Sequence, residues 1–155
     1  MSVRTGDRAP AFVLPYRPGR YVDLSDHLGS EKVVLLCFPL AFSPTCTSEL
    51  GAIRDSWAKW KELDVSVFGV SVDSPFVTQR FRDEQQIPFP ILSDFNKEMT
   101  AAYGVLNPDL LGLKGVAHRS VFVIDSEGMV SFDWISEDPT AEPHYETIRQ
   151  AVETA

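Results

Sequence analysis

Apolar residues gather in two runs of strand length, residues 33–38 and residues 65–73. Such runs are typical of central strands that are buried on both faces of a parallel sheet. Between them, apolar residues at steps of three and four predict an amphipathic helix: Leu50, Ile53, Trp57 and Trp60. Strand, helix and strand at this spacing predict a βαβ unit with a right-handed crossover.

The pattern also predicts elements on either side of this unit. Ser74 and Pro75 begin a second helix that runs to about residue 86, with serine as cap and proline at the first position. Further strands are expected at residues 20–25, 91–93, 119–124 and 129–135, and further helices at 97–103 and 143–154. The sum predicts an α/β protein with a thioredoxin-like fold, in which helices flank a central mixed β-sheet.

Length and charge narrow the class of protein. A chain of 155 residues with 44% hydrophobic and 23% charged residues is typical of one globular domain. Its net charge of −8 disfavours binding to nucleic acid or to an anionic membrane surface. The longest apolar stretch, residues 33–42, is far shorter than the roughly 20 residues that a membrane span needs. Charges at Arg4, Asp7 and Arg8 are unlike a secretory signal, so a cytoplasmic protein is expected.

The chain has two cysteines, Cys37 and Cys46, without a Cys-x-x-Cys pair. In the cytoplasm such cysteines are expected to be reduced thiols, either buried or reactive. The three histidines are scattered: His27, His118 and His144. No metal site and no cofactor are therefore expected.

The candidate chemistry lies in the segment from Pro39 to Cys46, between the first buried strand and the first helix. Ser43 suits a helix N-cap and Pro44 the first helical position, which places Cys46 in the first turn. Free backbone N–H groups and the helix dipole favour the thiolate there, which is the nucleophilic form of cysteine. The carboxyl end of a central strand is also expected to expose the sulfur at the sheet edge. Alternatively, Cys46 is a small buried apolar residue, Ser43 only a cap and Pro39 only a strand end.

This segment resembles the peroxiredoxin motif Pro-x-x-x-Thr/Ser-x-x-Cys, met by Pro39, Ser43 and Cys46. Other stretches resemble the family's landmarks in the same order: residues 6–12, 89–94, 103–105 and 119–125. The resemblance covers nearly the whole chain, and it implies a single peroxiredoxin domain over residues 1–155. It is strongest to the one-cysteine alkyl hydroperoxide reductase E type, with the bacterioferritin comigratory protein type next.

The resemblance implies a thiol-dependent peroxidase that reduces hydrogen peroxide and organic hydroperoxides through a sulfenic acid on Cys46. It implies that Arg119 holds the thiolate and donates hydrogen bonds to the peroxide oxygens. Ser43 is expected to offer a hydroxyl to the peroxide or to the sulfur, and Pro39 to shape the pocket and exclude water. Without the resemblance, Arg119 reads as an ordinary surface charge at a strand end.

Two further residues are assigned supporting roles by the same resemblance. Glu49 is expected to orient a neighbouring arginine, and Arg54 is the candidate partner. An acidic residue early in a helix is also favoured by the dipole alone, without any catalytic role.

Many relatives carry a second, resolving cysteine five residues after the first, where this chain has Gly51. Cys37 lies in a predicted buried strand and is expected to miss the Cα separation of about 7 Å that a disulfide with Cys46 needs. A one-cysteine mechanism with an external reductant is therefore expected: a low-molecular-weight thiol, a glutaredoxin-like protein or thioredoxin.

Relatives are often dimers packed near the active-site loop, so a homodimer is expected. Residues 40–42 could contribute to its interface, or Phe42 could line the pocket.

Two other functions fit the same fold. One is a monothiol disulfide oxidoreductase or redox carrier, since Ser43 stands where a dithiol enzyme needs its second cysteine. The other is a binding domain without catalytic activity.

Overall fold

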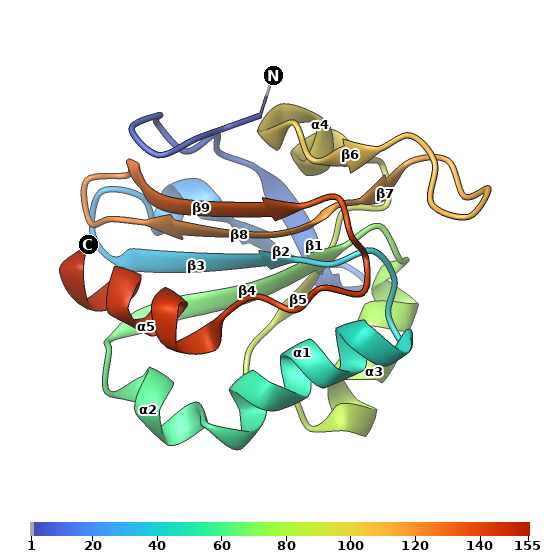
Figure 1. Cartoon of the computed structure of the whole chain (residues 1–155), viewed down its shortest axis with the longest axis horizontal. Coiled ribbons are helices and arrows are strands. Elements are labelled where there is room, and N and C mark those ends of the chain that lie inside the picture. Colours follow the sequence, from blue (N-terminus) through green and yellow to red (C-terminus); the bar gives the residue numbers. More distant parts are fainter. Residues whose placement is uncertain (1) are drawn as a thin grey trace.

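The two apolar runs form adjacent parallel strands at the centre of a five-stranded sheet (Figure 1). The computed structural model describes residues 2–155. The sheet has the order β5-β4-β3-β8-β9, where β3 (Lys32–Cys37), β4 (Val65–Ser71) and β5 (Ile91–Ser93) are parallel. The strand β8 (Arg119–Ile124) runs antiparallel to β3, and β9 (Val130–Ser136) runs antiparallel to β8 at the edge of the sheet. The predicted mixed sheet is thereby confirmed.

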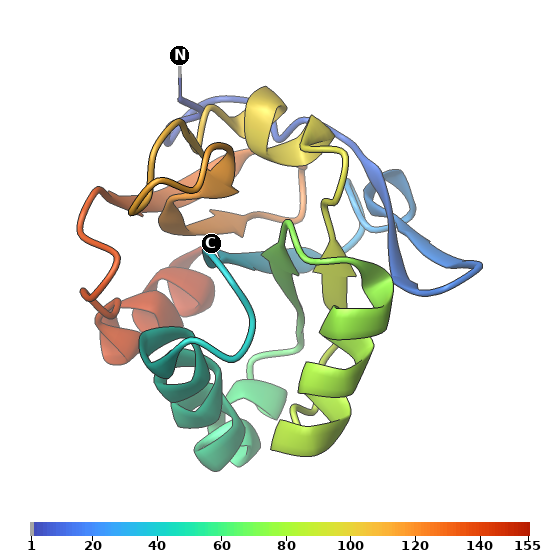
Figure 2. The ribbon, with the colours of Figure 1, turned by 90° about the vertical axis from the view of Figure 1, so that its right-hand side faces the viewer.

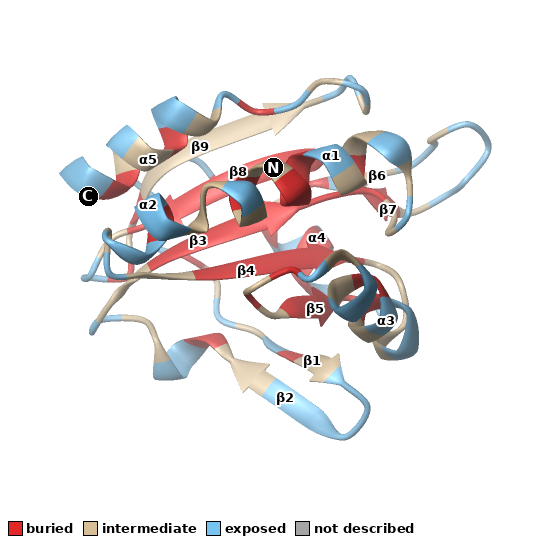
Figure 3. Ribbon diagram, turned by 90° about the horizontal axis from the view of Figure 1, so that it is seen from below, coloured by how far each residue is buried: buried red, intermediate tan, exposed pale blue. Residues whose placement is uncertain are grey.

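Helices cover both faces of this sheet (Figures 1 and 3). One face carries the four helices α1 (Pro44–Asp55), α2 (Trp57–Lys61), α3 (Pro75–Gln85) and α5 (Tyr145–Thr154). The other carries α4 (Glu98–Tyr103) and the 3-10 helix η1 (Leu24–Asp26). A hairpin of β1 (Val13–Arg17) and β2 (Arg20–Asp23) packs beside β5 and closes that edge.

Successive side chains of β3 point to opposite faces of the sheet, and each face has its own hydrophobic core. Val34 and Leu36 face α1, α2 and α5, whereas Val33, Leu35 and Cys37 face α4 and the β1–β2 hairpin. All of these side chains are fully buried, as expected for a central strand. Cys37 therefore lies on the face of the sheet opposite to that covered by α1.

Local sequence signals place the element ends to within two residues of prediction. The Ser74 hydroxyl caps α3 by accepting a hydrogen bond from the Val77 backbone N–H. Gly104, at φ +71°, ends α4 in the left-handed conformation, and Gly128, at φ +85°, closes the turn between β8 and β9.

The structure differs from the prediction in one helix and in three short strands. The helix expected to carry Trp57 and Trp60 together with Leu50 is broken at Ser56, so the two tryptophans lie on α2. The Ser56 hydroxyl donates to the Ala52 carbonyl, a bond that competes with the regular helix. The strands β1, β6 (Leu106–Asn107) and β7 (Val116–Ala117) were not predicted, because the last two are too short to show a period.

The loop from β3 to α1 lies at the carboxyl ends of the parallel strands, the side that faces the viewer in Figure 2. No helix within residues 2–155 is long and apolar enough to cross a membrane. Over the same residues, no group of three or more potential metal ligands is found. Open α/β sheets bind ligands outside the carboxyl ends of their strands, and the segment from Pro39 to Cys46 lies at that edge.

Candidate active site

The start of α1 places Cys46 as the sequence predicts. Ser43 is the N-cap by its extended backbone (φ −69°, ψ 149°), Pro44 is the first helical residue and Cys46 is the third. A sulfur in this first turn lies near the positive end of the helix dipole, which favours an anion.

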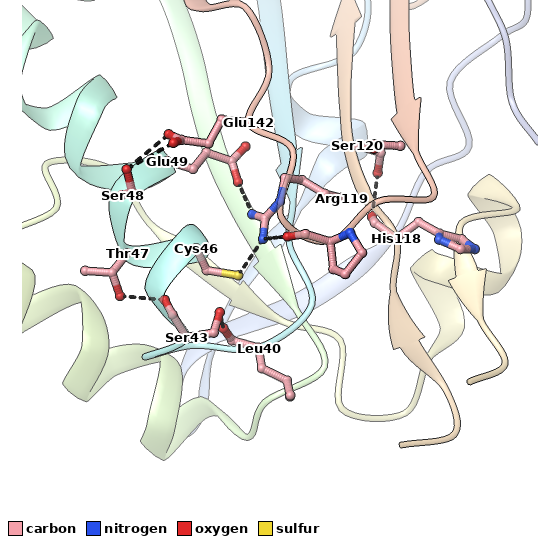
Figure 4. A network of polar contacts seen from close by, with 12 residues as sticks. Leu40, Ser43, Cys46, Thr47, Ser48, Glu49, His118, Arg119, Ser120 and Glu142 are labelled. Atoms are coloured by element: carbon pink, nitrogen blue, oxygen red, sulfur yellow. Dashed lines mark hydrogen bonds and ion pairs between the residues drawn. The ribbon is translucent and has the colours of Figure 1, made fainter. Parts of the chain in front are cut away.

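Arg119 reaches this sulfur from another part of the chain (Figure 4). Because Ser120 pairs with Cys37 across β8 and β3, Arg119 begins β8 just where β3 ends. Its Nη2 donates a hydrogen bond to the Cys46 Sγ at 3.1 Å, and its Nη1 donates to the Glu49 Oε1 at 2.5 Å. The guanidinium thus bridges a thiol and a carboxylate that both belong to α1.

All three side chains are closed off from solvent. Cys46 and Glu49 are 0% exposed and Arg119 is 1% exposed. The expectation that the sheet edge exposes the sulfur is wrong, because the segment after β9 folds over the site. The Pro139 carbonyl in this segment accepts a hydrogen bond of 2.9 Å from the Arg119 Nη2. The sulfur is buried against a cation rather than in hydrocarbon alone.

Burial and charge act in opposite directions on this cluster. Burial by itself lowers the pKa of Arg119, but Glu49 and Cys46 outweigh it and raise the pKa above its ordinary value. Arg119 therefore stays cationic. Burial raises the pKa of Glu49 to about 7, although the Arg119 charge acts to lower it. One cation is shared between two groups that become anionic on losing a proton.

The cluster leaves two buried polar atoms unused. Within the described residues, the Arg119 Nε and the Glu49 Oε2 have no hydrogen-bond partner. An unpaired buried donor is costly, so it marks a position where a further acceptor is favoured.

Ser43 and Pro39 border a cavity of about 270 Å³ that Arg119 also lines. The Ser43 hydroxyl donates to the Leu40 carbonyl at 2.9 Å and makes no capping bond to the helix. Its lone pairs stay available to accept a hydrogen bond. Pro39 is buried and forms part of the cavity wall.

Arg54 does not belong to this cluster, so its predicted pairing with Glu49 is wrong. Its Nη1 donates to the Gln85 carbonyl at 2.7 Å and its Nε to Asp55 at 2.9 Å. Residues five positions apart project from different sides of a helix, which directs Arg54 away from Glu49. The arginine that Glu49 contacts is Arg119.

Two contacts of the site were missed by sequence reasoning. Asp73 accepts hydrogen bonds of 2.7 Å from the Ala41 N–H and from the Ser71 hydroxyl, and so fixes the loop before α1. The position of Asp73 just after the buried strand β4 could have identified it as a site residue, because polar residues at the ends of parallel strands gather at one edge of the sheet. No sequence pattern could have identified the Pro139 carbonyl, because every residue has a backbone carbonyl.

The second cysteine is remote from the cluster. Cys37 is fully buried on the other face of the sheet, and its thiol contacts the Met99 sulfur at 4.0 Å. Burial raises the pKa of Cys37 to about 12, so it remains a neutral thiol. Both cysteines are free.

Comparisons with known proteins agree with this geometry. The model of the AhpC/TSA family matches residues 5–132. A putative peroxiredoxin bcp of Coxiella burnetii is 36% identical over 137 residues, which cover 86% of this chain and 89% of that protein. The peroxiredoxin Bcp of Escherichia coli K12 is 30% identical over 149 residues, which cover 94% of this chain and 93% of that protein.

The fold is shared with solved structures. The crystal structure of the peroxidoxin BcpB from Mycobacterium tuberculosis superimposes with a TM-score of 0.86 at 30% identity, covering 98% of this chain and 97% of that one. A peroxiredoxin-like protein from Aquifex aeolicus gives a TM-score of 0.88 at 28% identity, with coverage of 99% and 88%. The thioredoxin-like fold is thereby confirmed. The chain belongs to the AhpC/TSA family and is a peroxiredoxin, a thiol-dependent peroxidase.

Proposed function

We propose that Cys46 is the peroxidatic residue of a one-cysteine mechanism. The thiolate attacks the terminal oxygen of a hydroperoxide, so that an S–O bond forms as the O–O bond breaks. The other oxygen leaves and takes up one proton, giving water or an alcohol. Two electrons pass from sulfur to the peroxide, and Cys46 becomes a sulfenic acid.

The contact between Arg119 and the Cys46 sulfur is the observation that carries this proposal. A permanent cation stabilises the thiolate before attack and the departing oxygen after it. The unpaired Nε offers a further donor for a peroxide oxygen. Ser43 and Pro39, which border the cavity at Arg119, are proposed to contact the peroxide and to limit the entry of water.

Regeneration of Cys46 is proposed to use two external thiols. The first condenses with the sulfenic acid, releasing water and leaving a mixed disulfide. The second attacks that disulfide and restores the Cys46 thiol. A low-molecular-weight thiol, a glutaredoxin-like protein and thioredoxin all supply this chemistry. The position of Cys37 across the sheet and of Gly51 on α1 supports an external reductant.

We also propose that the chain is of the one-cysteine alkyl hydroperoxide reductase E type, because its single candidate cysteine at the start of α1 fits a one-cysteine mechanism. A homodimer is proposed to form at the loop before α1. Phe42 in that loop packs on Phe81 of α3, with ring centroids 5.0 Å apart, and remains 46% exposed for such a contact.

The one-cysteine mechanism predicts the product of a single turnover. Reduced protein mixed with one equivalent of hydrogen peroxide is expected to lose one thiol and to gain one oxygen atom at Cys46 by mass spectrometry. The Cys37→Ala variant should give the same product at a rate within about twofold, because Cys37 lies in the opposite core. A Cys37–Cys46 disulfide in the wild-type product contradicts the mechanism.

Glu49 is proposed as a positioning residue for Arg119. Because the Glu49 side chain fixes one arm of the guanidinium, Glu49→Gln is expected to slow peroxide attack by roughly tenfold. Stopped-flow measurements of thiol loss would show this. An unchanged rate contradicts the positioning role.

The raised pKa of Glu49 gives this variant a second readout. Its pKa in the folded protein, about 7, lies above the ordinary 4.5, so the neutral form stabilises the fold below about pH 4.5. This contribution is lost as the pH rises through 7. Urea unfolding should therefore show that wild type loses more stability than Glu49→Gln over this range. Parallel curves would mean that Glu49 is ionised throughout.

A further inference from the structure

The chain between β9 and α5, residues 137–144, forms neither a helix nor a strand. Its Pro139 carbonyl contacts the Arg119 guanidinium, next to a Cys46 side chain that is 0% exposed. We call residues 137–144 the covering segment. A thiol reacts only with a sulfur that it can approach, so an external thiol reaches Cys46 only if part of this structure moves. The covering segment and the start of α1 are the two candidates for this movement.

The start of α1 is held in place by several half-buried hydrogen bonds. Asp73 accepts a bond of 2.7 Å from the Ala41 N–H in the loop before the helix. The Ser43 carbonyl accepts two bonds from Thr47, at 3.0 Å from the backbone N–H and at 2.9 Å from the hydroxyl. Hydrogen bonds that are shielded from water are costly to break, so this part of the structure resists opening.

An exposed side chain, that of Glu142, joins the covering segment to α1. Its carboxylate accepts hydrogen bonds from the Ser48 hydroxyl on α1, which lies 3.2 Å from each carboxylate oxygen (Figure 4). It also accepts a hydrogen bond from the Tyr145 hydroxyl at the start of α5. Because Glu142 and Ser48 are both exposed, water competes for their contact and its net contribution is modest. Segments held by few buried contacts are those that open locally, so the covering segment opens more readily than α1.

We propose that Glu142 is a positioning residue that holds the covering segment over Cys46. Reagents larger than hydrogen peroxide reach the sulfur when this segment, rather than the start of α1, moves away. The inference rests on the function proposed above, in which an external thiol attacks the oxidised Cys46. That thiol has to approach the sulfur in line with the S–O bond that breaks, which needs more room than the entry of a two-oxygen peroxide.

The test compares two reagents of different size on the reduced protein, in the Cys37→Ala background so that a single thiol reports. Iodoacetamide transfers its carbamoylmethyl group to the Cys46 sulfur and releases iodide, whereas hydrogen peroxide transfers one oxygen. Both reactions consume the thiolate, so the ratio of the iodoacetamide rate to the peroxide rate reports access rather than ionisation. In Glu142→Ala this ratio is expected to rise roughly three- to tenfold, because the contacts with Ser48 and Tyr145 are lost.

Ser48→Ala separates the two candidate movements. It removes the hydrogen-bond donor on α1 without changing the charge, so opening of the covering segment should raise the ratio roughly two- to fivefold. Alanine also favours the helix more than serine does, so the ratio should fall if α1 itself opened. The double variant Glu142→Ala/Ser48→Ala should not exceed Glu142→Ala, because both changes remove the same contact.

The matched control is Glu137→Ala, which removes an equally charged and exposed side chain from the same segment. Glu137 lines a different cavity, together with Arg4 and His118. Its ratio should equal that of the Cys37→Ala protein.

A ratio that stays at the Cys37→Ala value in Glu142→Ala or in Ser48→Ala overturns the proposal. So does a fall in Ser48→Ala, which would assign access to the start of α1, and so does an equal rise in Glu137→Ala. If hydrogen peroxide does not oxidise Cys46, the proposed function itself fails. The iodoacetamide rates of the same variants then still test the covering segment, so the two failures are distinct.

Discussion

Replacing Cys46 with serine is expected to abolish peroxide consumption while the protein stays folded. The serine hydroxyl has nearly the size of the thiol but is not ionised at neutral pH, so it offers no nucleophile of comparable strength. Turnover can be measured as hydrogen peroxide consumption with dithiothreitol as reductant, and the fold by circular dichroism.

The control for this variant is Cys37→Ala, which removes the other thiol from the opposite core. It should retain turnover, since burial keeps the pKa of Cys37 near 12 and the thiol neutral. Retained activity in Cys46→Ser together with loss of activity in Cys37→Ala would place the chemistry at Cys37 and contradict this prediction.

The second large effect is expected at Arg119. Arg119→Met keeps an unbranched side chain about as long as the apolar stem of the arginine but removes the cation that contacts the sulfur at 3.1 Å. We expect peroxide attack to slow by roughly 10²–10³-fold, the effect of losing one donor that stabilises developing negative charge. Stopped-flow rates at pseudo-first-order peroxide would measure it.

Arg119→Met also leaves Glu49 buried without its ion-pair partner. Breaking a buried pair in this way costs about 3–5 kcal/mol, which could unfold the variant. The double variant Arg119→Met/Glu49→Gln removes the orphaned carboxyl and should be more stable than the single one. If the folded double variant reacts with peroxide at the wild-type rate, Arg119 has no role in the reaction.

The parts of the site that the sequence could predict are those with a local physical signature. A buried strand, a cap, a proline and a cysteine in the first turn are consecutive in the chain, so the position of Cys46 follows from short-range rules. The strand register then places Arg119 beside it, which the family resemblance anticipated and spacing alone did not.

The parts that could not be predicted depend on long-range contacts. The burial of Cys46 depends on the segment after β9, whose Pro139 carbonyl binds Arg119 through a backbone atom that every residue has. Glu49 pairs with Arg119 rather than with Arg54 because of helix geometry and strand register together. The break at Ser56 follows from a hydroxyl bond to the preceding turn, which the apolar period masks.

The loop before α1 likewise combines a local sequence signal with a long-range contact that the sequence does not show. Asp73 directly follows a buried strand in the sequence, which marks it as a candidate site residue. That it fixes the loop before α1 is evident only from the fold, which brings its carboxylate to the Ala41 N–H. This contact fixes the backbone that leads into the cysteine helix. The sequence contained each residue, and the parallel arrangement of β3 and β4 brought the two segments together.

The contact between the Arg119 guanidinium and the Cys46 sulfur is the central feature of the proposed mechanism. The direct measurement is the second-order rate of hydrogen peroxide attack on Cys46 at pH 7, in the Cys37→Ala background so that a single thiol reports. Two folded proteins that differ only at Arg119 are compared, Glu49→Gln and Arg119→Met/Glu49→Gln. The protein that lacks Arg119 should react roughly 10²–10³-fold more slowly. Equal rates for the two proteins would contradict the mechanism.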